Sequence, residues 1–181
     1  MVMLKRLFAI LLAVMLFLST ALSEPAEVLA DESFAVTDGI SVERGYDYVT
    51  PGEVSLYLYV FGELPPNYLT KAEARDMGWV SSEGNLWNIG YGLTIGGDVF
   101  GNREGLLPDA KGRTWYECDV NYFGGFRGGE RLVFATDGLI YYTMDHYESF
   151  ELLYNGWFDP DYRYGEEEVD SYDEGWWSWL W

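Results

Sequence analysis

Residues 131–144, with the sequence RLVFATDGLIYYTM, decide the fold of this chain. Two β-rich runs, residues 131–136 and 139–144, are joined by Asp137-Gly138, and Asp-Gly between such runs is the strongest short-range signal of a β-hairpin. Upstream, residues 114–120 (TWYECDV) alternate with a period of two, which indicates a third strand with Glu117 on one of its faces. A last short strand is expected at residues 149–153. The second half of the chain therefore predicts an antiparallel sheet.

The first half carries helix signals instead. The segment Thr50-Pro51-Gly52-Glu53 provides a capping residue, a proline at the first helical position and a capping-box glutamate, and Gly62 ends the helix. A second capping box begins at Thr70, and the short helix that follows is expected to end at Gly78. A third short helix is expected near Asn85. Helices first and an antiparallel sheet second predict an α+β fold, with N-terminal short helices packed on an antiparallel β-sheet.

The N-terminal residues 1–23 have the organisation of a secretory signal peptide. Lys5 and Arg6 precede an apolar run, residues 7–18, and the small residues of Ala21-Leu22-Ser23 suit a signal peptidase. A membrane anchor is the alternative, but the run is shorter than the ~20 residues of a spanning helix. Val28-Leu29-Ala30 is a second candidate cleavage site. We therefore expect a secreted, extracellular protein without stable membrane association.

Composition divides the remainder of the chain into three parts. Residues 24–49 are acidic and are expected to be irregular, as a linker or a propeptide-like segment. Residues 50–153 carry the helix and strand signals and form the expected domain. Residues 154–181 form an acidic tail that is rich in aromatic residues and ends in WWSWLW.

Charge and residue counts limit the possible functions. After residue 23 the chain has nine Lys and Arg against 30 Asp and Glu, a net charge of −21, which by itself argues against a nucleic-acid partner. Cys118 is the one cysteine, so no internal disulfide can form, and a single His and a single Cys do not favour zinc. The acidic run at residues 166–170 lacks the spacing of a calcium loop. No metal and no cofactor are expected.

A small set of residues in the central domain suits metal-independent cleavage of RNA. The ribose 2′-OH must lose a proton to attack the phosphorus, the leaving 5′-oxygen must gain one, and the phosphoryl oxygens need positive charge. Glu117 on its strand face supplies a base and His146 in a turn supplies an acid. The scarce cations of the domain include Lys71, Arg103, Arg127 and Arg131. Taken singly, these residues also have structural interpretations: His146 as a structural histidine, and Arg131 as the partner of Glu130 in an ion pair.

The stretch from Leu64 to Leu153 resembles, without a gap, the secreted bacterial guanyl-specific ribonucleases of the barnase and binase type. The matching segments occur in order and at the same spacings: LPPNYLTK (64–71), MGWV (77–80), GNL (84–86), IGGDVF (95–100), NREG (102–105), GRTWYE (112–117), GFR (125–127), Glu130-Arg131 and DHY (145–147). The resemblance covers about half of the chain and implies the α+β fold of that family.

The resemblance also implies roles for individual residues. Glu117 matches the general base and His146 the general acid of a two-step reaction, transesterification to a 2′,3′-cyclic phosphate and hydrolysis to a 3′-phosphate. The phosphate-binding cations correspond to Lys71, Arg127 and Arg131, and Tyr147 matches an active-site tyrosine. Binding of guanine is implied for Phe100, Asn102, Arg103 and Glu104, with Ser82 and Asn85 in a supporting shell. Gly101 departs from the family, where a small hydroxyl residue is usual, and this loosens the expected guanine loop.

The resemblance identifies the expected partners as well. The substrate is single-stranded RNA cleaved preferably after guanine, the protein is expected to be a monomer, and a barstar-like protein inhibitor is implied. The C-terminal tail is absent from the minimal family domain. It is either a solvated extension, a surface-binding tail, or a segment that masks the cleft. A catalytically silent or tail-masked binding module, toxin-like and with the same fold, is therefore the alternative function.

Overall fold

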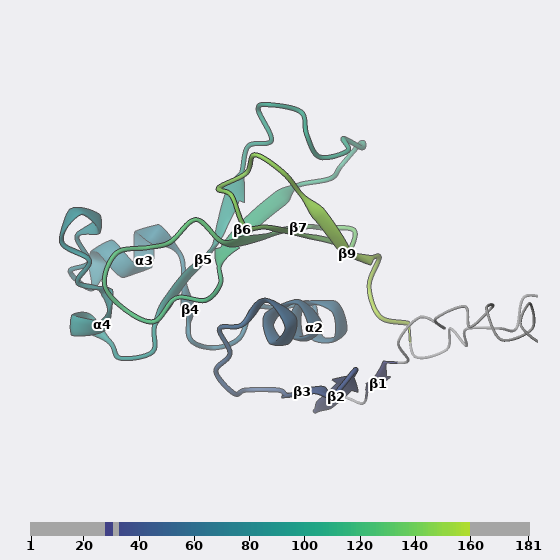
Figure 1. Ribbon diagram of the computed structural model, residues 1–181, viewed down its shortest axis with the longest axis horizontal. Helices are drawn as coiled ribbons and strands as arrows, with labels where there is room; N and C mark the ends of the chain where they lie inside the picture. The colour runs from purple at the N-terminus through teal and green to yellow at the C-terminus, as the bar shows by residue number, and fades with distance from the viewer. Residues whose placement is uncertain (1–27, 31–32, 160–181) are drawn as a thin grey trace, which may run out of the picture.

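The computed structural model describes residues 28–30 and 33–159, which form helices packed on two sheets (Figure 1). The larger sheet has six strands in chain order, β4 to β9, and the smaller has three, β1 to β3. Neighbouring strands are antiparallel throughout, except that β4 and β5 run parallel. The six strands are β4 (Tyr68–Leu69), β5 (Thr94–Phe100), β6 (Trp115–Asp119), β7 (Arg131–Ala135), β8 (Leu139–Thr143) and β9 (Glu151–Asn155).

The predicted α+β fold is confirmed, and the strands predicted from the period-two pattern form the centre of the large sheet. The Asp137-Gly138 turn joins β7 to β8, with Gly138 in the left-handed region at φ 86° and its N–H donating to the carbonyl of Ala135. The last strand lies two residues later than expected, because β9 runs from Glu151 to Asn155.

Two strands are not apparent in the sequence pattern. β5 contains Gly96 and Gly97, which hide its alternation, and its register with β6 shifts between Gly96 and Asp98. A Cβ atom on Gly96 would lie 2.5 Å from the Cβ of Cys118, so only glycine allows the two strands to approach this closely. β4 has only two residues, too few for any periodicity to show.

The helices begin and end at the predicted signals. α2 (Pro51–Phe61) is capped by the Thr50 side chain and ends at Gly62, which is left-handed at φ 69°. α3 (Lys71–Asp76) begins with the complete capping box of Thr70 and Glu73. A 3₁₀ turn, η1 (Ser81–Glu83), and the short α4 (Leu86–Ile89) follow. The boundaries at Thr50, Gly62 and Thr70 therefore follow from local chemistry that the sequence displays, whereas η1 was not predicted and neither η1 nor α4 has a side-chain N-cap.

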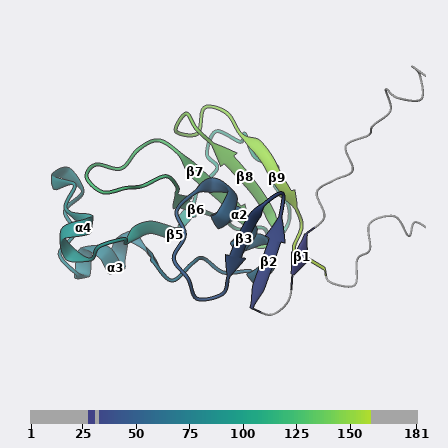
Figure 2. The ribbon, with the colours of Figure 1, turned by 60° about the horizontal axis from the view of Figure 1, so that its bottom comes forward.

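The N-terminal segment is not irregular, contrary to the expectation for residues 24–49. β1 (Leu29–Ala30), β2 (Phe34–Thr37) and β3 (Ile40–Glu43) form a small antiparallel sheet that lies against α2. Figures 1 and 2 show α2 between this sheet and the large one. Ala35 and Val42 pack on Leu56 and Tyr57, all at most 1% exposed, because these helix residues are too apolar to face water.

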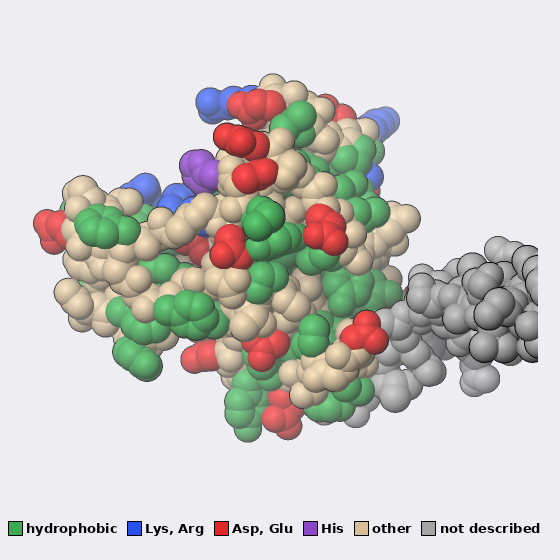
Figure 3. Space-filling model, viewed as in Figure 1, with side chains coloured by type: hydrophobic (Ala, Val, Ile, Leu, Met, Phe, Trp, Pro, Cys, Tyr) green, Lys and Arg blue, Asp and Glu red, His purple; other side chains and the backbone are tan. Residues whose placement is uncertain are grey.

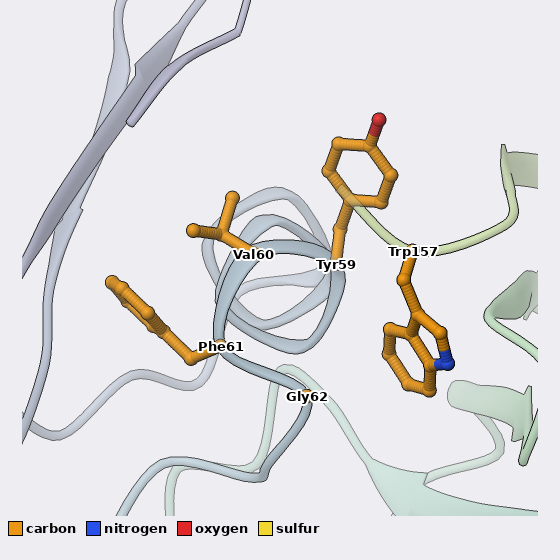
Figure 4. Close-up of a pocket in the computed structure, with 5 residues that line it drawn as sticks. All are labelled: Tyr59, Val60, Phe61, Gly62 and Trp157. Atoms are coloured by element: carbon orange, nitrogen blue, oxygen red, sulfur yellow. The ribbon is translucent and has the colours of Figure 1, made fainter. Parts of the chain in front are cut away.

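The folded part of the chain continues past Leu153, the expected end of the domain. The backbone N–H of Phe158 donates to the carbonyl of Tyr59 on α2, and the rings of Tyr59 and Tyr154 stack at 4.2 Å between centroids. Figure 4 shows Trp157 beside the C-terminal end of α2, where it lines a shallow groove with Tyr59, Val60, Phe61 and Gly62. The expected signal peptide and most of the aromatic tail lie outside the described residues. Among the residues described, no helix has the length and apolar character needed to cross a membrane.

Candidate active site

The centre of the site is Glu117, a carboxylate on β6 that is only 9% exposed. The ammonium of Lys71, at the start of α3, donates to its Oε1 at 2.5 Å, and the hydroxyl of Tyr147 donates to its Oε2 at 2.6 Å. Burial alone would raise the pKa of Glu117. The two hydrogen bonds and the positive charges of Lys71 and Arg131 outweigh burial, so the pKa of Glu117 lies below its ordinary value. Glu117 is therefore ionised at neutral pH.

Tyr147 keeps its proton beside this carboxylate. Burial, the hydrogen bond to Glu117 and the charge of Glu117 all raise the pKa of Tyr147 well above its ordinary value. Its ring lies 5.2 Å from that of Phe100 and 4.8 Å from that of His146, between centroids. Tyr147 thus connects three of the residues predicted from sequence, namely Glu117, Phe100 and His146.

Two arginines share one buried carboxylate. Asp119 is 2% exposed; its Oδ2 and Oδ1 accept hydrogen bonds from Nε and Nη2 of Arg127 at 2.5 and 2.7 Å. The Nε of Arg131 lies 2.8 Å from Oδ1 of Asp119 as an ion pair, outside hydrogen-bond geometry, while its Nη1 donates to the carbonyls of Gly128 and Glu130. Burial would lower the pKa of Arg127, but the bond to Asp119 raises it. Asp119 therefore fixes both guanidinium groups on the side of β6 that carries Glu117.

His146 lies in a strained turn that follows β8. His146 and Tyr147 both have positive φ, 58° and 76°, a conformation that is rare outside glycine. The turn is held by Asp145, whose carboxylate accepts from the backbone N–H groups of Glu148 and Ser149 and from the hydroxyl of Ser149. These bonds lower the pKa of Asp145 to about 2. His146 is exposed, and Figure 3 shows it, the one histidine, beside blue Lys and Arg side chains.

The expected guanine loop is an ordered turn between β5 and β6. Asn102 is left-handed at φ 41°, and its side chain bridges the backbone N–H and C=O of Leu107 at 3.1 and 2.8 Å. Arg103 and Glu104 are exposed beside it. Gly101 does not have positive φ, and a Cβ atom there would make ordinary contacts with Arg103. A residue with a side chain would therefore fit at position 101, and the path of the loop does not require glycine there.

The expected supporting residues Ser82 and Asn85 lie in the segment between α3 and α4. The Asn85 side chain accepts from the N–H of Val80 and donates to the carbonyl of Gly78, so it fixes the turn between α3 and α4. Ser82 is exposed in η1. Within the described part of the chain, the side-chain hydrogen bonds of Asn85 reach Val80 and Gly78 and not Glu117 or His146.

Sequence reasoning missed the role of three carboxylates that position the site. Asp119 orients the arginines, Asp145 shapes the turn of His146, and Asp98 accepts from the backbone N–H of Lys71 at 2.9 Å. A signal for Asp119 was present, because residues two apart on a strand share a face and Asp119 follows Glu117 by two. The other two contacts join loops and helix ends that no periodic pattern brings together.

The fold and the site together define an α+β protein that holds an ionised carboxylate, a histidine and a cluster of cations on the six-stranded sheet and the segments that adjoin it. A sequence model of the ribonuclease family, described as "Ribonuclease", matches residues 57–154. The chain belongs to this family of barnase- and binase-type ribonucleases, as the sequence resemblance predicted, and its activity class is that of a ribonuclease.

Individual relatives agree with this assignment. The chain is 56% identical over 97 residues to a ribonuclease of Heyndrickxia coagulans, covering 54% of this chain and 89% of the relative. It is equally identical over the same length to a ribonuclease of Bacillus intermedius, of which it covers 60%. A guanyl-specific ribonuclease St of Saccharopolyspora erythraea is 47% identical over 57 residues, 31% of this chain and 56% of the relative.

Proposed function

We propose that this protein is a secreted, metal-independent endoribonuclease that cleaves single-stranded RNA preferably after guanine. The observation that carries the proposal is the position of Glu117, a buried carboxylate kept ionised by Lys71 and Tyr147, with the exposed His146 against the ring of Tyr147. An ionised carboxylate is ready to accept a proton, and an exposed imidazole can exchange one with a leaving group.

In the first step, Glu117 takes the proton of the ribose 2′-OH while the 2′-oxygen attacks the phosphorus. His146 gives a proton to the 5′-oxygen as its bond to phosphorus breaks, which leaves a 2′,3′-cyclic phosphate. In the second step the roles reverse: His146 activates water, Glu117 returns the proton to the 2′-oxygen, and a 3′-phosphate forms. Lys71, Arg127 and Arg131 stabilise the charge that develops on the phosphoryl oxygens.

Guanine preference is assigned to the loop of residues 100–104. The exposed carboxylate of Glu104 can accept from both N1–H and N2–H of guanine, and backbone N–H groups near Asn102 and Arg103 can donate to its O6. The ring of Phe100 can stack on the base. The bonds from Asn102 to Leu107 support this proposal, because they hold the loop before any base arrives.

The test is cleavage of a short RNA with one internal guanine by the chain that follows Ser23, in EDTA. Wild-type protein should release a product ending in a cyclic phosphate 3′ to guanine. Glu117→Ala and His146→Ala should each lower kcat/KM by about two to four orders of magnitude, the contribution of general acid–base catalysis. Activity that EDTA abolishes, or that both variants retain, would contradict the mechanism.

The alternative, a tail-masked or catalytically silent binding module, has a separate test. The last described segment lies beside α2, where the N–H of Phe158 donates to the carbonyl of Tyr59, so masking requires a tail that reaches from α2 to the turn of His146. Wild-type silence with activity restored in a chain that ends at Asp159 would support masking. Silence in both would support the binding module, for which a barstar-like inhibitor stays the first partner to try.

A further inference from the structure

A second concave site lies apart from Glu117 and His146, between the start of α2, the loop after α4 and the loop after β6. It is a cavity of about 390 Å³, within the range of small-molecule sites. Figure 3 shows hydrophobic side chains gathered at the lower left, over α4 and the segment that leads from it to β5. Its lining residues are Asp47, Tyr48, Val49, Glu53, Asn67, Trp87, Tyr91, Gly92, Tyr122 and Phe123.

Half of the residues that line this cavity are aromatic, and two of these rings face water. The ring of Trp87 lies 4.8 Å from that of Tyr91 and 5.8 Å from that of Tyr122, the latter pair edge to face. Tyr91 is 87% exposed and Phe123 is 66% exposed. Exposed apolar surface that is gathered in one place marks an interaction site, and these exposed rings border one cavity.

The walls are held in place without a ligand. The side chain of Asn67, which is 4% exposed, accepts from the N–H of Tyr48 and donates to the carbonyls of Tyr48 and Gly92, so it ties two walls together. The indole N–H of Trp87 donates to the carbonyl of Leu93, and the N–H of Asn121 donates to the carbonyl of Val49. Such bracing reduces the ordering cost of binding.

The charge of the lining is negative. Asp47 and Glu53 are its two charged residues, and no Lys, Arg or His is among the residues that line it. A cation placed over Trp and Tyr faces is attracted by the ring quadrupoles, and a carboxylate beside it adds to the attraction. An anion such as RNA meets the opposite field here, which separates this cavity from the site that carries Lys71, Arg127 and Arg131.

We propose that this cavity, lined by Trp87, Tyr91, Tyr122 and Phe123 with the carboxylates of Asp47 and Glu53, is a binding site for an organic ammonium ion. The ligand class is a small molecule that carries a quaternary or alkylated ammonium group. The methyl groups contact the rings, and the charge is balanced by the two carboxylates. The site is independent of the ribonuclease reaction.

Choline is the probe, and its uncharged analogue, with carbon in place of nitrogen, is the matched control ligand. Binding to the chain that follows Ser23 is followed by calorimetry and by the indole N–H resonance of Trp87, identified with Trp87→Phe. Choline should shift that resonance and bind on the order of tenfold more tightly than the analogue at low salt. Equal binding of the two, or a shift confined to other tryptophans, would overturn the proposal.

Two variants test separately how a carboxylate and an exposed ring contribute to choline binding. Glu53→Gln keeps the geometry of the α2 cap and removes a charge, and Tyr91→Ala removes an exposed ring; each should weaken choline binding several-fold. Glu151→Gln, which removes an exposed carboxylate of β9 outside the cavity, is the matched control and should bind as wild type. All three should cleave RNA normally, which shows that they are folded. Equal loss in Glu151→Gln would indicate only general attraction to an acidic protein and would refute the site.

Discussion

Glu117 depends on a single neighbour for much of its ionisation. We predict that Lys71→Met lowers kcat/KM by about two to three orders of magnitude, because it removes a donor to both the base and the phosphate. It also moves the acidic limb of the pH–rate profile to higher pH, since the pKa of Glu117 is no longer lowered by the ammonium. The measurement is kcat/KM against pH for both proteins. An acidic limb that stays in place would show that Lys71 does not control the base.

The lowered pKa of Glu117 also raises the free energy of unfolding, and the pH range of this effect can be predicted. Because the pKa of Glu117 is lower in the folded protein than in the unfolded chain, its contribution is fully present above the unfolded carboxyl value of about 4.3. It is lost as the pH falls through the folded value. Lys71→Met should therefore reduce the free energy of unfolding at pH 7 but make little difference in strong acid.

Asp119 should matter more for folding than any exposed acidic residue. Replacing it by Asn leaves Arg131, 3% exposed, without its buried counter-ion, and we predict a loss of about 3–5 kcal/mol in the free energy of unfolding. Urea denaturation measures the loss. The matched control is Asp137→Asn, which breaks the more exposed Arg113–Asp137 pair and should be milder. Similar losses for both would show that burial of the Asp119 pair is unimportant.

At this scale the sequence predicts which residues should carry the chemistry but not how they are held. Glu117 and its strand face follow from alternation, and the family resemblance identifies His146. The left-handed turn at His146 and Tyr147 was not predicted, because non-glycine residues with positive φ give no compositional signal. Its cause is the set of bonds to Asp145, which depends on the three-dimensional path of the chain.

Among the elements, α2 has two buried faces. Leu58 packs toward the large sheet and Leu56 toward the N-terminal sheet. We predict that Leu56→Ala and Leu58→Ala each cost about 2–5 kcal/mol in the full protein. In a chain that begins at Gly45, Leu58→Ala should cost as much, but Leu56→Ala much less, because its face is already open to water. Thermal or urea unfolding of the four proteins and their two parents tests this.

Leu58→Ala is the control for Leu56→Ala, because a general loss of stability in the shortened chain would change the cost of both substitutions. Equal costs for Leu56→Ala in both backgrounds would mean that the N-terminal sheet does not cover α2 in solution.

The sequence pattern did not reveal this sheet, because its strands have at most four residues and lie in an acidic stretch. The helix caps and the β7–β8 turn, which are strictly local, were predicted correctly.

For the whole molecule, net charge should control the encounter with RNA. Between Leu64 and Leu153 there are seven Lys and Arg against 13 Asp and Glu, a net charge of −6. Long-range repulsion is screened over a Debye length of about 10 Å at 0.1 M salt. We predict that kcat/KM rises or stays level as salt is raised from low concentration and falls only at high salt. A steep fall from the lowest salt would show that the local cations alone decide the encounter.

The position of the two described ends has a practical result. β1 and the segment after β9 both lie beside α2, at the end of the molecule away from His146 (Figures 1 and 3). Whatever is joined to either end of the folded part is therefore attached away from the face that carries His146. The protein can be tethered to a bead, a cell surface or another domain through either end, with His146 still turned toward the solution.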